Sequence, residues 1–238
     1  MRLGIMQPYF FPYLGYYELI ARTDRWIVFD VVKYTPKSWM NRNRILHPRQ
    51  GWQYVSVPVI HTGADMLIKD VVTVDRARAA ERILGQIDHY RVRRAPHFAA
   101  VRELVRGSLL DGDSALLRDV NVRSLALVCA YLGINAHLDN LSELGLALPE
   151  INDPGHWALE ISSALGASEY LNPPGGRELF DAAAFATRGI RISFTEMPVF
   201  VYDCRPYQHI PNLSILDVLM WNAPARVREY LCRNRDAN

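Results

Sequence analysis

The chain has 238 residues, of which 50% are hydrophobic and 22% are charged, and this is the composition of a soluble globular protein that can bury a substantial core. Its formal net charge is +2, and this balance excludes the strong positive field of a typical nucleic-acid-binding protein. Three cysteines without paired spacing, no signal peptide and no apolar run of about 18 residues predict a cytoplasmic protein without disulfides or a membrane span.

Residues 2–30 form the first predicted unit. The apolar run Arg2–Met6 and the run Trp26–Asp30 predict buried strands, with a helix over Tyr16–Ala21 between them. Residues 7–15 contain two prolines and four aromatic residues, so we expect a stiff, non-helical loop that suits a preformed site. The alternative is that these aromatic side chains simply start the hydrophobic core.

The rest of the chain predicts alternating strands and helices. Strands are predicted over Gly51–Val59, Leu67–Val74, Asn135–Leu138, Ser168–Leu171 and Gly189–Phe194. Helices are predicted over Arg76–His89, His97–Ser108, Ala115–Leu132, Gly155–Leu165, Arg177–Phe185, Ser214–Met220 and Ala225–Cys232. We therefore expect one α/β domain over residues 1–238: a mainly parallel, Rossmann-like sheet with helices on both faces and a mostly helical insertion at about residues 76–132.

The first candidate site residues follow the first two strands. In open α/β sheets the ligand binds at the carboxyl ends of the strands, where Gln7, Tyr9 and Asp30 are expected. A second group comes just after them and consists of Asn41, Arg42 and Asn43. Asparagine is a poor core residue unless its hydrogen bonds are met, and the planar guanidinium of arginine suits phosphate or carboxylate. We expect Arg42 to bind an anionic group.

Two later segments are candidates with ordinary alternatives. Asn172, Gly175 and Gly176 lie between a predicted strand and a predicted helix, where free N–H groups and the helix dipole can face an anion. The alternative is a plain turn that uses glycine for its backbone freedom. Asn212, Ser214 and Asp217 either cap a helix or face a pocket. We expect the N-terminal loop, residues 41–43 and the glycine loop to line one cleft.

These segments resemble the WbqC-like proteins nearly end to end. The resemblance rests on residues 5–16, on Trp39 with residues 41–46, on residues 170–173 with 175–176, and on residues 211–217. It implies transfer of an acyl or aminoacyl, glycine-like group onto an amino sugar or sugar nucleotide in O-antigen, other polysaccharide or secondary-metabolite biosynthesis. A non-catalytic ligand-binding or scaffold protein of such a pathway is the alternative. The opening unit also resembles the nucleotidyltransferase-like variant of the Rossmann fold, but tyrosines stand where that variant usually has histidines.

Transfer to an amine needs hydrogen-bond donors for an oxyanion and a base for the proton. Gln7 and residues 41–43 supply donors, and Asp30 or Asp217 supplies the catalytic carboxylate. The family typically has a second acid after Asp30, where this chain has Val31. Asp30 is therefore expected to be a lone carboxylate with a raised pKa, acting without metal. The histidines do not cluster, so no metal or cofactor is predicted, and an acyl carrier protein or another activated acyl donor is left open as the partner.

Overall fold

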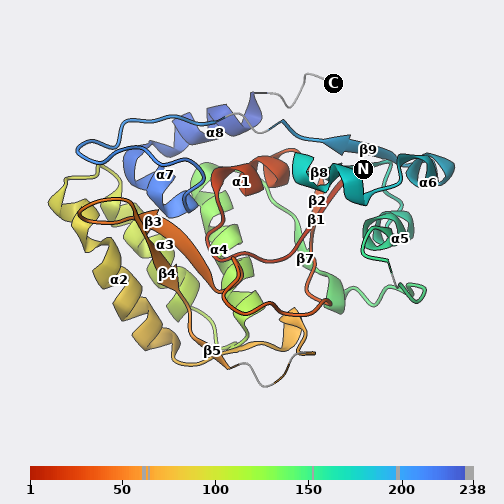
Figure 1. Ribbon diagram of the computed structural model, residues 1–238, viewed down its shortest axis with the longest axis horizontal. Helices are drawn as coiled ribbons and strands as arrows, with labels where there is room; N and C mark the ends of the chain where they lie inside the picture. The colour runs from red at the N-terminus through yellow and green to blue at the C-terminus, as the bar shows by residue number, and fades with distance from the viewer. Residues whose placement is uncertain (61–62, 64, 152, 197–198, 234–238) are drawn as a thin grey trace.

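The computed structural model describes residues 1–60, 63, 65–151, 153–196 and 199–233. Its centre is a five-stranded sheet with the strand order β7-β2-β1-β8-β9 (Figure 1). These strands are β1 (Arg2–Met6), β2 (Arg25–Val28), β7 (Leu138–Asn140), β8 (Glu169–Asn172) and β9 (Arg191–Phe194). Every pairing in this sheet is parallel, which confirms the predicted Rossmann-like α/β architecture.

β1 lies in the middle of the sheet, and the chain extends the sheet first on one side of it and then on the other. The strand order therefore reverses between β1 and β8, and such a reversal leaves a crevice at the carboxyl ends of the two strands. Met6 ends β1 and Asn172 ends β8, so the residues that follow these two strands face the crevice. This is the position at which open α/β sheets bind their ligands.

Helices cover both faces of the sheet. Successive side chains of a strand point to opposite faces, so neighbouring residues of one strand enter different cores. Trp26 and Val28 of β2 share a core with α1 (Leu14–Ala21), α4 (Leu117–Leu132) and α8 (Pro224–Cys232). Ile27, between them, packs in a second core with α5 (His156–Ala164) and α6 (Ala182–Thr187). Because both faces are buried, these strands read as apolar runs in the sequence rather than as alternations.

A helical layer and an antiparallel hairpin stand beside the sheet (Figure 1). The layer contains α2 (Arg76–Val92), α3 (Phe98–Leu110) and α4, and the hairpin pairs β3 (Arg42–Leu46) with β4 (Trp52–Ser56). Helix α2 packs on the hairpin: the Gln86 Nε2 atom donates to the Tyr54 carbonyl at 2.9 Å, and the Leu46 N–H donates to the Tyr90 hydroxyl at 3.1 Å. The helices of residues 76–132 are thus present, and their standing as an insertion in one domain stays a prediction.

Three predicted strands are placed or divided differently in the structure. The predicted strand Asn135–Leu138 overlaps β7 only at Leu138. The predicted strand Gly51–Val59 contains β4 and the start of β5 (Val59–Ile60). Strand β4 lies outside the central sheet because it pairs with β3, a strand that was not predicted. Leu67–Val74 contains the 3₁₀ turn η1 (Ile68–Asp70) and the short strand β6 (Val72–Thr73), which pairs with β5. The backbone N–H groups of residues 68 and 69 donate to the segment after β2, which holds this stretch in a turn.

The predicted helix Arg177–Phe185 is wrong. The chain forms the 3₁₀ helix η3 (Pro174–Leu179), breaks, and restarts as α6. The restart is at Asp181, whose side chain accepts a hydrogen bond from the Ala183 N–H as a helix cap does. The remaining elements are the 3₁₀ helix η2 (Leu141–Glu143) and α7 (Ile215–Trp221). No helix within the described ranges has the length and apolar character needed to cross a membrane.

Candidate functional site

The aromatic loop, residues 7–13, joins β1 to α1 and is fixed through its own carbonyl groups. The Asn43 Nδ2 atom of β3 donates to the carbonyls of Phe10 at 3.0 Å and Phe11 at 2.9 Å, and the Ser214 hydroxyl donates to the Phe11 carbonyl at 2.7 Å. Phe11 has φ +40°, a left-handed conformation that a non-glycine residue keeps only when its surroundings hold it. Asn43 and Ser214, predicted to bind substrate, are buried and use their side chains to hold this loop.

The same loop is held from two further elements. The Asn121 Nδ2 atom of α4 donates to the Pro8 carbonyl at 2.9 Å and to the Met40 carbonyl at 2.8 Å. The Tyr16 hydroxyl of α1 donates to the Gln7 carbonyl at 2.7 Å. With its carbonyls satisfied from β3, α1, α4 and the start of α7, the aromatic loop is a rigid wall rather than a mobile lid.

A first hollow, the switch-point hollow, lies at the crevice between β1 and β8 and encloses about 210 Å³. Its polar lining comes from the predicted residues Gln7, Tyr9 and Asn172. Its aromatic walls are residues that the sequence analysis did not select, namely Phe29, Trp157, Tyr170 and Phe180. The Tyr170 hydroxyl donates to the Asn172 Oδ1 atom at 2.9 Å, which fixes the amide at the end of β8.

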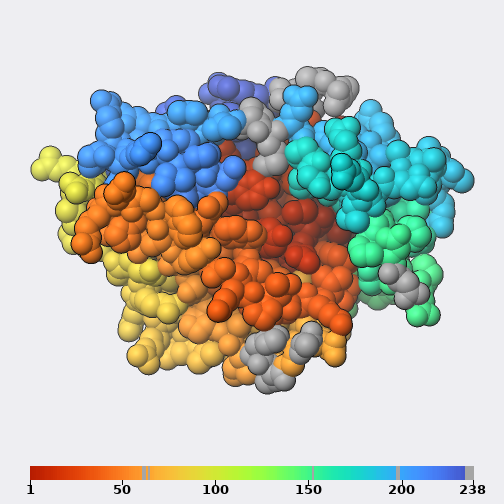
Figure 2. Space-filling model, viewed as in Figure 1, coloured from red at the N-terminus to blue at the C-terminus, as the bar shows by residue number. Residues whose placement is uncertain are grey.

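A second hollow, the hairpin hollow, lies between the aromatic loop and β3 and encloses about 310 Å³. It is lined by Tyr9, Tyr13, Trp39, Asn43, Arg44, Val199 and Asn212. Tyr9 lines both hollows, so they meet at this ring. Figure 2 shows the red N-terminal segment recessed between the orange region that contains β3 and β4, the blue C-terminal region and the cyan region after β8.

Burial raises the pKa of Tyr9, and burial also raises that of Tyr13, with smaller contributions from Tyr9 and Glu18. Both phenols therefore stay protonated at neutral pH, so that their O–H groups can act as donors. Neither hollow has a carboxylate or a histidine among the described residues that line it. The described lining of the two hollows thus combines phenol, amide and guanidinium groups with aromatic rings, a set that can bind polar and aromatic groups.

The other predicted binding residues do not line either hollow. The Arg42 guanidinium lies 4.1 Å above the ring of Tyr54, and the Asn41 Nδ2 atom donates to the Val57 carbonyl at 3.2 Å. In the glycine loop, the Gly176 N–H donates to the Pro173 carbonyl at 3.2 Å, so it is not open to an anion. Gly175 is exposed beside it. The structure therefore brings together the aromatic loop, β3 and the end of β8, but not residues 41–42 or the glycines themselves.

Comparison with known proteins gives two matches that run along nearly the whole chain. The model of the WbqC-like protein family matches residues 7–229. The chain belongs to the WbqC-like protein family. It is also 31% identical, over 98% of its length and 99% of the relative's, to an uncharacterized protein of Mycobacterium tuberculosis. No solved structure matches it. In this WbqC-like chain, the residues that carried the resemblance include some that line the two hollows, such as Tyr9, and some that hold the aromatic loop, such as Ser214. Others, such as Arg42, do neither.

Asp30 of the WbqC-like chain is not the lone carboxylate that was expected. Its side chain is fully buried, and it accepts hydrogen bonds from the Arg118 Nη1 atom at 2.7 Å, the Ser142 hydroxyl at 2.6 Å and the Ser142 N–H at 3.0 Å. Arg118 also pairs with Asp119 and Glu143. Asp30 thus ties the end of β2 to α4 and η2, and in this structure it does not reach either hollow. A role for Asp30 in turnover stays a prediction.

Asp217 is the buried acceptor of a second network. The hydroxyls of Tyr90 and Tyr202 both donate to its carboxylate, and the Tyr90 hydroxyl in turn accepts from the Leu46 N–H of β3. Burial raises the pKa of Asp217, and the two tyrosine hydrogen bonds oppose that shift. Its catalytic role also stays a prediction, since it lines neither hollow.

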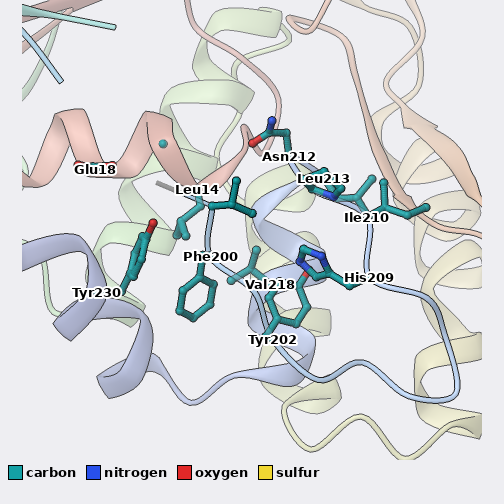
Figure 3. A pocket seen from close by; sticks show the side chains of 13 residues that line it. Leu14, Glu18, Phe200, Tyr202, His209, Ile210, Asn212, Leu213, Val218 and Tyr230 are labelled. Carbon is teal, nitrogen blue, oxygen red and sulfur yellow. The ribbon is translucent and has the colours of Figure 1, made fainter. Parts of the chain in front are cut away.

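A small cavity lies between this network and α1 (Figure 3). His209 and Tyr202 are side by side in it, with ring centroids 4.8 Å apart, and Asn212 forms part of the wall that it shares with the hairpin hollow. Glu18 of α1 also lines it, paired with Arg22 at 3.3 Å, and burial raises the Glu18 pKa. The cavity, of about 40 Å³, has room for water but not for a substrate.

We expect Asp217→Asn to remove a pH dependence of stability. The folded-state pKa of Asp217 is raised, so the stabilising contribution of its protonated form is complete below the unfolded-state pKa of about 4 and is lost as the pH rises through the folded-state value. The parent should therefore lose stability relative to Asp217→Asn as the pH rises above about 4. Urea unfolding of both proteins at a series of pH values from about 4 to neutrality measures this difference in stability.

The exposed Asp113 provides the control, because Asp113→Asn removes the same charge outside the buried network. A difference in the free energy of unfolding between parent and Asp217→Asn that stays constant with pH would contradict the expectation. Such a constant difference would mean that only the hydrogen bonds of the carboxylate changed.

Proposed function

We propose that this chain is a transferase that places an acyl or aminoacyl group on the amine of an amino sugar, carried as a sugar nucleotide, for polysaccharide or secondary-metabolite biosynthesis. The observation that supports it is the two-part site. The switch-point hollow combines amide and phenol groups with aromatic walls, as sites for polar organic ligands do, and it is joined at Tyr9 to the hairpin hollow. A sugar nucleotide is itself a two-part ligand, with the sugar in the first hollow.

The reaction would use an acyl thioester as the activated donor, supplied on an acyl carrier protein or on a small thiol. The amine nitrogen of the sugar attacks the thioester carbonyl, and the new C–N bond gives a tetrahedral intermediate with an oxyanion. When this intermediate collapses, the C=O bond re-forms, the C–S bond breaks, and the leaving thiolate takes up the amine proton and departs as a thiol. The Tyr9 hydroxyl and the Gln7 amide are the donors available for the oxyanion of the intermediate. Since the described lining of the hollows holds no carboxylate, the leaving thiolate is the natural proton acceptor.

The test is to incubate the full chain with amino sugar nucleotides and acyl or aminoacyl thioesters and to follow the amide product by mass spectrometry. We expect Tyr9→Phe to lower the rate about 100-fold, as loss of one oxyanion donor does. Tyr131→Phe on α4, outside both hollows, should leave it unchanged. A rate that is equal in Tyr9→Phe and in the parent would contradict this placement of the reaction.

A second candidate is a non-catalytic ligand-binding protein of the same pathway. It is favoured by the positions of Asp30 and Asp217, since both candidate bases are buried and already hydrogen-bonded. Binding of amino sugar nucleotides without any amide product, with every donor class tested, would select this candidate over the transferase.

A further inference from the structure

Arg44 is a charged side chain of the hairpin hollow that uses little of its hydrogen-bonding capacity. Its Nη2 atom donates to the Asn212 carbonyl at 3.4 Å, and its buried Nε atom has no hydrogen-bond partner. It forms no ion pair with any carboxylate of the part of the chain that the structure describes. A half-buried guanidinium in that state retains the capacity for a strong, charge-assisted hydrogen bond to an anion.

Some half-buried arginines of the described chain have carboxylate partners, and others, namely Arg42, Arg76 and Arg123, have none there. Arg2 pairs with Glu169 at 2.9 Å, and Arg25 pairs with Asp139 at 2.6 Å. Arg118 shows the same behaviour with Asp30. Arg76 and Arg123 donate to backbone carbonyls instead, and the Arg42 guanidinium lies over the ring of Tyr54. What sets Arg44 apart is its position, since it is the arginine among the described residues that line the hairpin hollow.

The Arg44 guanidinium is also held in place before any ligand arrives. It lies 5.2 Å from the ring centroid of Trp39 and 5.2 Å from that of Trp52, so two indole rings limit its movement. The backbone N–H of Arg44 donates to the Asn43 Oδ1 atom at 2.8 Å, which holds the main chain from which this side chain extends. A cation that is fixed in advance loses little conformational entropy on binding, which favours affinity.

The hairpin hollow offers a ring surface beside this cation. Trp39 is 39% exposed, an unusual exposure for a tryptophan, and the phenols of Tyr9 and Tyr13 complete the wall. The volume of about 310 Å³ is at the lower end for ligand pockets, which span roughly 300–1,000 Å³. With no carboxylate among its described lining residues, the hollow presents one positive charge and aromatic faces.

We propose that the hairpin hollow binds the nucleoside diphosphate half of the sugar nucleotide, with a phosphate on Arg44 and the base stacked on Trp39. The inference rests on the proposed function for the identity of the ligand, and it assigns the second hollow that the proposed function left unassigned. Because Tyr9 lines both hollows, a diphosphate on Arg44 directs the attached sugar past Tyr9 toward Gln7 and Asn172.

The test is calorimetric titration of the full chain with UDP, dTDP and GDP, with the matching nucleosides, and with inorganic pyrophosphate. We expect at least one nucleoside diphosphate to bind, and Arg44→Gln to weaken its binding about 10- to 100-fold, the fold-change expected when a hydrogen-bonded charge is lost. Arg44→Lys, which keeps the charge but loses the planar fork, should fall between Arg44→Gln and the parent. Trp39→Ala should weaken both the nucleoside diphosphate and the nucleoside.

Arg93→Gln is the matched control, because Arg93 is an exposed arginine that also lies over an aromatic ring, 5.9 Å from that of Tyr207, outside the hollow. It should not change the affinity. If Arg42→Gln alone weakened nucleoside diphosphate binding, Arg42 would be the residue that binds the anion, as the sequence analysis expected, and the proposal would be overturned. Pyrophosphate binding as tight as that of the diphosphates, or no binding of any diphosphate, would overturn it too. The titrations contain no acyl donor, so a failure of the transfer reaction leaves their outcome unaffected.

Discussion

Asn43→Ala is expected to lower the free energy of unfolding by roughly 3–5 kcal/mol, because it removes the partners of the buried Phe10 carbonyl and of the partly buried Arg44 N–H. The Phe11 carbonyl keeps the Ser214 hydroxyl but loses the amide that supports its left-handed backbone. For a chain of this size the melting temperature should fall by roughly 6–20 °C. Urea or thermal unfolding followed by circular dichroism measures the change.

Asn41→Ala is the control for this prediction, since it makes the same substitution two positions earlier in the chain. The Asn41 side chain is only half-buried, and its Nδ2 atom makes one hydrogen bond, to the Val57 carbonyl, so a loss of about 1 kcal/mol is expected. Equal losses in the two variants would show that the anchoring of the aromatic loop contributes no special stability.

Arg118→Met should destabilise the fold by a similar amount, about 3–5 kcal/mol, because breaking a buried ion pair leaves the other charge unpaired. The carboxylate left behind is that of Asp30, which has no exposure to solvent. The double variant Asp30→Asn/Arg118→Met, which removes both charges, should be more stable than Arg118→Met alone. Chemical unfolding of the parent, the two single variants and the double variant gives the coupling energy directly.

Arg25→Met provides the comparison with a less buried pair, in which Arg25 and Asp139 are each about one-fifth exposed. It should cost at most about 1 kcal/mol. If the double variant proved less stable than Arg118→Met, Asp30 would be stabilised mainly by Ser142, and the pairing with Arg118 would have to be reinterpreted.

Strands β1 and β2 could be predicted from the sequence because they are buried on both faces and stand out as apolar runs. The edge strand β7 consists of Leu138, Asp139 and Asn140 and is only partly buried, so the predicted strand Asn135–Leu138 overlaps it at Leu138 alone. The hairpin could not be recognised in the same way. Strand β3 has the sequence Arg42–Leu46, with two arginines on one face, and it becomes a strand through its pairing with β4 and through the aromatic rings that cover those arginines. Partners of that kind come from tertiary structure and leave no periodic signal.

The candidate site likewise contains residues that the sequence could identify and residues that it could not. Gln7, Tyr9 and Asn172 could be placed because they follow strands that lie side by side. For Asn43 and Ser214 the sequence could not decide between binding a ligand and satisfying the backbone of a distant loop, since both uses need the same polar atoms. Arg44 was passed over in favour of Arg42, although both lie on the same face of β3, because the sequence does not show which arginine borders a hollow.

The anchoring of the aromatic loop has a consequence for synthesis of the chain on the ribosome. The loop is synthesised before the side chains that hold its carbonyls, which come from Asn43, then Asn121 and finally Ser214. Strand β1 likewise waits for β8 before both of its edges are paired. Until Ser214 and β8 have been synthesised, the nascent chain therefore carries an unpaired strand edge and aromatic residues that only the folded protein buries. This state exposes it to aggregation and makes chaperone binding to the segment around β1 and the loop advantageous.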